Sequence, residues 1–365
     1  MTGRDRRRAL LACGLAGLLA LAGALAGEPA PARRAPSDPG AVGLLRGAAD
    51  AARRVPYEGR RFLTTWNRGR AVTSHAAVAH TPGGVVRYEG DAGAGAYPDS
   101  AATGDTAGFT AATLALLTRN YSVVRAGDTA ICGRRARVVE ARRADGTPAG
   151  RFWIDADTGL MLYRELIDAT GRRVVASGFT EIRLGLGAPR VVPALAGGSG
   201  RGSGRLDEQV VPNSATTLSM WPDELTGAEV AAMRADGWPV PDELPGRLSR
   251  YDARRGARGA VHLSYSDGLA AVSVFVQRGG LDERAMTAAG GWRRTERRGR
   301  TVFRRESLGR WAVAAGGGYV YTVVTDAPPS TAVAVAAELS RDRTSFWTRV
   351  TRGARRIGSA AGPFD

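Results

Sequence analysis

The sequence predicts an α+β protein with two domains. Residues 150–184 alternate strand-forming runs with Asp-Thr-Gly and Ala-Thr-Gly turns, which is typical of an antiparallel meander. Two other segments, 41–54 and 111–120, are predicted as helices, and the first places its apolar residues at helical spacing. The stretch GGSGRGSG at 197–204 has the composition of a flexible tether and marks the boundary between the domains.

The N-terminus predicts export. Basic residues at the start precede an apolar run over residues 9–26, which ends in the cleavage pattern Ala-Leu-Ala. Residues 1–26 are therefore interpreted as a signal peptide. An uncleaved N-terminal anchor is the alternative, because the run nearly reaches the length that spans a bilayer. A Pro-rich spacer follows over 27–44, and the protein is expected in the periplasmic or cell-wall space, tethered to the membrane if the anchor is kept.

The N-terminal domain is expected over residues 45–190. Its middle meander strand opens with Leu160 to Tyr163, which place apolar side chains on both faces of the strand. In a sheet with one face exposed to solvent, apolar and polar residues would alternate along the strand. Both faces are therefore expected to be covered, one by a helix and the other by a second element or a bound apolar ligand. The expected strands are 61–67, 71–80, 84–90, 121–126, 135–142, 150–156, 159–167 and 173–184.

The C-terminal domain is expected over residues 223–340, after a Gly/Ser-rich linker at 191–222. Thr226 and Glu229 have the spacing of a capping box at the start of a short helix. Ser330 is expected to cap a long terminal helix. The strands expected between these helices lie near 301–306, 310–315 and 318–325.

Residues 261–276, VHLSYSDGLAAVSVFV, predict a β-hairpin with Asp267-Gly268 as a two-residue loop. The alternative is a Ser-His-Asp catalytic site, but Asp267 lies in the turn, several residues from His262, and cannot orient its ring. The pairs expected from this loop are Tyr265 with Ala270, Leu263 with Val272, Val261 with Val274, and His262 with Ser273.

The chain is strongly basic, with a net charge of +16, and all of its 51 basic residues are arginines. No nucleic-acid-binding motif accompanies this charge, so nucleic acid is not an expected partner. Residues 341–365 are predicted as a basic helix and tail that contacts an anionic membrane or an acidic partner. The alternative is a helix that packs on its own domain with a solvated arginine face. The arginines proposed for the contact are Arg349, Arg352, Arg355 and Arg356.

The sequence lacks the common motifs of catalytic sites. It has no phosphate-binding loop, Rossmann glycine pattern, metal-spaced His/Cys cluster or nucleophile elbow. We therefore expect no catalytic residues, no metal, no cofactor and no enzymatic activity.

Several segments together resemble the RseB/MucB family of sigma-E regulators. YSDGLAAVSVFV at 265–276 is similar to the most recognisable part of that family's C-terminal domain. RNYSVVRAGDTAICGRRARVVE at 119–140 and FWIDADTGLMLYRELIDATGRRVVASGFTEIRLG at 152–185 resemble two parts of its N-terminal domain. The resemblance runs in order from about residue 45 to 340, with a linker in the expected place.

The resemblance implies a non-enzymatic regulator. It implies a large LolA/LolB-like domain, in which a curved antiparallel half-barrel wraps on a helix around an apolar cavity, and a smaller α+β domain. The implied partner is the extracytoplasmic domain of a membrane-spanning anti-sigma factor, and the implied signal is a lipid-like ligand, such as a lipid or acyl chain, or another envelope-stress signal. A lipid or lipoprotein carrier without regulatory output is the alternative.

Two sets of residues are expected to serve these roles. The turn of the predicted hairpin is a candidate surface for docking the partner, and apolar strand residues of the N-terminal domain are candidates for the pocket, although an ordinary core would look the same. The docking residues are Tyr265, Ser266, Asp267 and Gly268, and the pocket residues are Trp66, Phe152, Ile154, Leu160 and Leu162.

Overall fold

The computed structural model describes most of both expected domains. Residues 1–26, the Gly/Ser-rich stretch 197–204 and the arginines at 349–356 lie outside the described residues, so the predictions made for them stay predictions. The described ranges are 34–67, 70–82, 86–90, 109–185, 221–256, 259–306 and 309–341.

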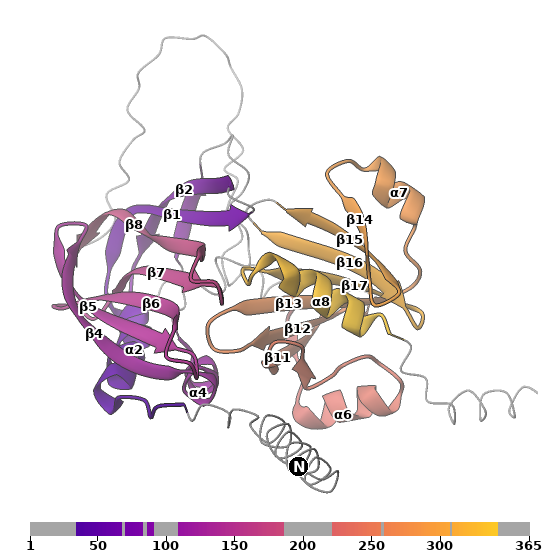
Figure 1. The fold of residues 1–365 in the computed structure, drawn as a ribbon, viewed down its shortest axis with the longest axis horizontal. Coiled ribbons are helices and arrows are strands. Elements are labelled where there is room, and N and C mark those ends of the chain that lie inside the picture. Colours follow the sequence, from indigo (N-terminus) through magenta and orange to yellow (C-terminus); the bar gives the residue numbers. More distant parts are fainter. Residues whose placement is uncertain are drawn as a thin grey trace, which may run out of the picture.

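The N-terminal domain is an eight-stranded antiparallel sheet that curves around two helices (Figure 1). Neighbouring strands follow the order β3-β2-β1-β8-β7-β6-β5-β4, so the first and last hairpins of the domain meet at β1 and β8. The elements are α2 Pro39–Arg54, β1 Tyr57–Asn67, β2 Arg70–His80, β3 Arg87–Gly90, α4 Ala111–Asn120, β4 Ser122–Ile131, β5 Arg134–Arg142, β6 Pro148–Asp155, β7 Met161–Ile167 and β8 Arg173–Leu184.

Local sequence explains where the two helices begin and which face they bury. Asp38 caps α2 by accepting a 2.8 Å hydrogen bond from the Gly40 amide, and Leu45 is fully buried on the face toward the sheet. Thr110 and Thr113 form a capping box at the start of α4, whose Leu117 is fully buried. Both helices were expected, and both are confirmed.

The C-terminal domain is a second antiparallel sheet, with the strand order β10-β11-β12-β13-β17-β16-β15-β14 and with β9 paired to β11. Helix α8 lies across one face of it (Figure 1), where Val335 and Ala336 are fully buried. The elements are β9 Asp223–Glu224, α6 Gly227–Ala235, β10 Glu243–Leu244, β11 Leu248–Arg255, β12 Val261–Ser266, β13 Ala271–Arg278, α7 Glu283–Ala288, β14 Arg293–Arg297, β15 Arg300–Glu306, β16 Arg310–Gly316, β17 Tyr319–Thr325 and α8 Pro329–Leu339.

Two expectations about helix caps have different outcomes. The capping box at α6 is confirmed, because the Thr226 amide donates to Glu229 at 2.8 Å and the Glu229 amide donates back to the Thr226 hydroxyl. The expected cap at Ser330 is wrong. Helix α8 already begins at Pro329, and Pro328 occupies the cap position without a side-chain hydrogen bond. Proline at the first helical position needs no amide partner, which explains this start.

The predicted hairpin forms, but its register differs from the expected one by two residues. The loop has four residues, 267–270, because the Asp267 carboxylate accepts hydrogen bonds from the amides of Leu269 and Ala270, each at 2.8 Å. A shift of two residues keeps every side chain on its face, so the predicted faces are confirmed. The observed pairs are Ser266 with Ala271, Tyr265 with Val272, Leu263 with Val274, and His262 with Phe275.

Candidate functional site

The loop between β12 and β13 extends to the N-terminal domain and packs on α4 (Figure 1). At Gly268 the backbone has φ of 99°, and a Cβ atom there would lie 2.2 Å from the backbone nitrogen of Leu117. No side chain fits into this contact, and the left-handed backbone favours glycine as well. The glycine in the sequence Ser-Asp-Gly-Leu thus allows the backbone of the loop to approach the backbone of α4 closely.

Hydrogen bonds fix this loop to the end of α4. The Tyr121 hydroxyl donates to Oδ2 of Asp267 at 2.6 Å, and Nδ2 of Asn120 donates to the Asp267 carbonyl at 2.9 Å. Arg247 donates to the Asn120 carbonyl at 3.1 Å, and its guanidinium lies 5.3 Å from the centre of the Tyr121 ring. Burial raises the pKa of Tyr121, and the adjacent Asp267 carboxylate raises it further.

The loop also completes the hydrophobic core of the N-terminal domain. Leu269 and Ala270 are buried and belong to the same cluster as Leu117 and Leu166. A Cβ at Gly150 of β6 would lie 3.0 Å from Cδ2 of Leu269, so this strand and the leucine are in close contact. A segment of one domain therefore supplies core side chains to the other.

These contacts give the hairpin turn a role within the chain. Tyr265 and Ser266 are buried within the C-terminal domain, and Asp267 and Gly268 contact α4 of the same chain. The turn therefore packs on the chain's own N-terminal domain. Its predicted role in docking a partner stays a prediction.

A second junction between the domains forms around Arg310, which is 2% exposed. Its guanidinium donates to the carbonyls of Trp66 at 3.0 Å, Val174 at 3.1 Å and Asp326 at 2.9 Å. Burial lowers the pKa of Arg310, and the Asp326 carboxylate opposes that effect. Arg164 of β7 adds an ion pair to Asp326 at 2.8 Å. Arg310, the first residue of β16, is therefore hydrogen-bonded to the end of β1 and to the start of β8.

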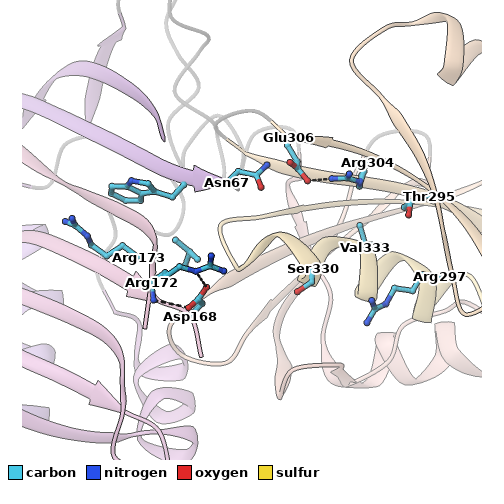
Figure 2. A pocket seen from close by; sticks show the side chains of 12 residues that line it. Asn67, Asp168, Arg172, Arg173, Thr295, Arg297, Arg304, Glu306, Ser330 and Val333 are labelled. Atoms are coloured by element: carbon cyan, nitrogen blue, oxygen red, sulfur yellow. Dashed lines mark hydrogen bonds and ion pairs between the residues drawn. The ribbon is translucent and has the colours of Figure 1, made fainter. Parts of the chain in front are cut away.

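Next to this junction lies a cleft of about 690 Å³ between the two domains. Figure 2 shows Asp168, Arg172 and Arg173 on the N-terminal side, and residues of β14, β15 and α8 on the C-terminal side. The full lining is Trp66, Asn67, Asp168, Arg172, Arg173, Val174, Thr295, Arg297, Arg304, Glu306, Ser330 and Val333.

The charge of the cleft is mostly positive, with four arginines and two carboxylates in its lining. Both carboxylates are paired, Glu306 with Arg304 and Asp168 with Arg172 at 3.6 Å. Burial raises the pKa of Asp168, but hydrogen bonds from Thr170 and from the Arg172 amide outweigh it and hold that pKa below its ordinary value. The cleft therefore favours a ligand with negative charge.

One aromatic side chain, Trp66, lies within the charged lining. The Arg173 guanidinium lies 5.2 Å from the centre of the Trp66 ring and 3.9 Å from a Glu165 carboxylate oxygen. Arg173 therefore lies over the Trp66 ring at the distance of a cation–π contact, and both residues line the cleft.

The predicted pocket residues divide between two places. Trp66 lines the cleft, whereas Phe152, Ile154, Leu160 and Leu162 are buried in the core, each at most 3% exposed. The Phe152 ring packs edge-on against Phe109 at 5.1 Å. The arginine cleft was missed in the sequence, because its lining comes from positions more than a hundred residues apart that only the domain junction brings together.

In the part of the chain that the structure describes, no group of three or more His, Cys, Asp or Glu side chains is placed to bind a metal. No helix in that part is long and apolar enough to cross a membrane. His262 faces Phe275 across the hairpin, and their rings stack at 4.6 Å. The hairpin therefore pairs His262 with Phe275, and the predicted pairing with Ser273 is wrong.

The chain is similar to several solved structures. MucB is similar at 20% identity over 84% of this chain and 98% of that one, with a TM-score of 0.46. The MucA/MucB complex of Pseudomonas aeruginosa is similar at 22% identity over 81% and 97%, with a TM-score of 0.40. LprF from Mycobacterium bovis matches 45% of this chain and all of its own length at 13% identity, with a TM-score of 0.27. No curated protein matches the sequence.

The family comparison bears directly on the motifs quoted above. Residues 78–196 match the model of the MucB/RseB N-terminal domain, a range that includes the 119–140 and 152–185 segments. The matched part of the chain, residues 78–196, is therefore similar to the MucB/RseB N-terminal domain.

Proposed function

We propose that this protein is an extracytoplasmic regulator that binds the extracytoplasmic part of a membrane-spanning anti-sigma factor. The observation that carries the proposal is the arginine-rich cleft between the two domains, in a chain whose residues 78–196 match the MucB/RseB N-terminal domain. MucB has itself been solved in complex with the periplasmic part of MucA. Binding between the domains would let both domains contribute to recognition.

The structure supports a site that exists before the partner arrives. The two domains contact each other at two places, through Arg310 and through the loop at 267–270. These buried contacts fix the position of one wall of the cleft relative to the other. A preformed site loses less conformational entropy on binding than one that must first assemble.

The direct test is a binding titration between the full chain and the extracytoplasmic region of an anti-sigma factor encoded in the same genome. We expect a saturable complex that Arg172→Glu combined with Arg173→Glu weakens by about tenfold or more, because close charge pairs at interfaces have strong coupling. Arg46→Glu with Arg54→Glu on α2 is the matched control, since both side chains are exposed and far from the cleft lining. No binding by the wild-type chain would refute the proposal.

A lipid-like signal is the finer part of the same proposal. Phe152, Ile154, Leu160 and Leu162 would contact an acyl chain only if it entered the core that Leu269 now helps to fill. Native mass spectrometry of the purified chain separates the two functions. A carrier would retain stoichiometric lipid, whereas a regulator would bind lipid reversibly and lose affinity for the anti-sigma factor when lipid is added.

A further inference from the structure

Strand β14 (Arg293–Arg297) forms one edge of the C-terminal sheet and one border of the cleft. Among the described residues it pairs only with β15, and its ladder from Arg293 to Arg297 has no register shift. An edge of this kind presents unpaired N–H and C=O groups on its outer side. Thr295 and Arg297 line the cleft, so this open edge borders the site already described.

The other sheet edges in the described part of the chain are shorter or interrupted. Strand β4 carries a register shift between Arg125 and Gly127, where Gly127 has φ of 112°. Strand β10 has two residues, and β3 has four. Bulges, short length and charged side chains are the usual means of blocking strand addition. Strand β14 has no bulge but carries four charged residues, so it could pair only with a segment of complementary charge.

The charges on β14 limit what could pair with it. Side chains alternate between the two faces of a strand, so Arg293 shares the cleft face with Thr295 and Arg297. Arg293 and Arg297 are exposed, and no ion pair joins either of them to another described residue. On the opposite face, Arg294 lies 3.8 Å from Glu283 and 3.7 Å from Glu296, which makes that face nearly neutral.

This pattern argues against a second copy of the chain as the occupant. Two β14 strands side by side would bring arginines from both copies together, and like charges opposite one another destabilise a strand pair. A strand with carboxylates at alternate positions would instead place them beside Arg293 and Arg297. Arg172 and Arg173 on the facing wall of the cleft add to the same attraction (Figure 2).

We propose that the partner adds an extended segment to the β14 edge, with acidic side chains at every second position directed into the cleft. This inference rests on the proposed function and specifies how the same site recognises its partner. Backbone hydrogen bonds to β14 would hold the segment, and the arginines would select its charge pattern.

The experiment uses the full chain with two probes, the anti-sigma extracytoplasmic region and a short fluorescent peptide that alternates Glu and Thr. We expect both probes to bind, and the β14 amides to gain protection from hydrogen exchange while those of β4 do not. Arg293→Glu with Arg297→Glu is expected to weaken both affinities by about tenfold or more. Arg46→Glu with Arg54→Glu changes the net charge equally and is expected to leave them unchanged.

Backbone N-methylation of the peptide separates strand pairing from charge attraction alone. Consecutive amides of a strand point to opposite edges, so methylating one alternate set of residues should abolish binding and methylating the other set should spare it. Equal effects of the two sets, or β14 amides that stay unprotected, would overturn the inference. If the anti-sigma region binds the Arg293/Arg297 variant with unchanged affinity, the inference about the β14 edge is wrong and the proposed function stands. If the anti-sigma region does not bind the wild-type chain, the proposed function itself is wrong.

Discussion

The Tyr121 hydroxyl donates a 2.6 Å hydrogen bond to the Asp267 carboxylate, across 146 residues of sequence and between two domains. Tyr121 is 6% exposed, so this bond is largely shielded from water. The same carboxylate closes the hairpin loop through the amides of Leu269 and Ala270. One side chain therefore shapes the loop and fastens it to the other domain.

Tyr121→Phe is expected to lower the free energy of unfolding by about 1.5–3 kcal/mol, the range for a hydrogen bond to a charged group. Urea denaturation of the full chain measures this change. A double-mutant cycle with Asp267→Asn tests its origin, because the two changes should be strongly non-additive if they remove one shared interaction. Additive effects would mean that the bond contributes little.

Gly268→Ala is expected to separate the unfolding of the two domains. The new Cβ would meet the α4 backbone at 2.2 Å, and backbone cannot move aside as a side chain can. Gly246→Ala is the matched control, because Gly246 has a similar φ of 93° but open space around it. The control should lose only about 1 kcal/mol from backbone strain, with one cooperative transition in calorimetry, whereas Gly268→Ala should show two transitions. A single transition in both variants would contradict the role given to this contact.

Arg310→Ala is expected to destabilise the protein by about 3–5 kcal/mol, since it leaves buried partners of a charged group without their donor. Those partners are the carbonyls of Trp66, Val174 and Asp326. Arg305→Ala on the neighbouring strand is the control. Its side chain is exposed, so a change within about 0.5 kcal/mol is expected there. Thermal or urea unfolding of both variants provides the comparison.

Stability is expected to fall as pH decreases from about 6.5 to about 4 because of His262. Burial lowers the pKa of His262 from 6.5 to about 4, and neither ring nitrogen has a hydrogen-bond partner among the described residues. The unfolded chain therefore binds a proton in this range that the folded chain does not, so folding is favoured above pH 6.5 and loses up to about 3 kcal/mol by pH 4. His262→Phe should flatten this part of the stability profile measured by urea denaturation. An unchanged slope in that variant would assign the pH dependence to other groups.

Much of the N-terminal domain could be predicted from its local pattern. The meander over 150–184 has turn residues between apolar runs, and it forms β6, β7 and β8 as expected. In the C-terminal domain the arginine-rich segments did not reveal their structure. The sequence RRTER of β14 has no apolar alternation, because its strand lies at an edge and buries little. Its pairing with β15 decides its conformation, and no local signal reports that pairing.

The candidate site could be predicted only in part. The sequence predicted Asp267-Gly268 as a turn, but not the length of the loop. The Asp267 carboxylate accepts hydrogen bonds from two amides, which extends the loop to four residues and changes the register of the hairpin. Phe152 and Leu162 were recognised as apolar strand residues, yet alternation alone does not tell a core from a ligand pocket. Arg310 and Trp66 are 244 residues apart, so the cleft between their domains depends on tertiary structure alone.

The loop at 267–270 also affects when, during synthesis, the core of the N-terminal domain becomes complete. Leu269 and Ala270 belong to the core of a domain whose own strands end at Leu184. During synthesis the N-terminal sheet is complete in sequence well before these two residues exist, and until they arrive its apolar interior has an uncovered gap at α4. The apolar core of the N-terminal domain is thus complete only after the hairpin of the C-terminal domain has been synthesised.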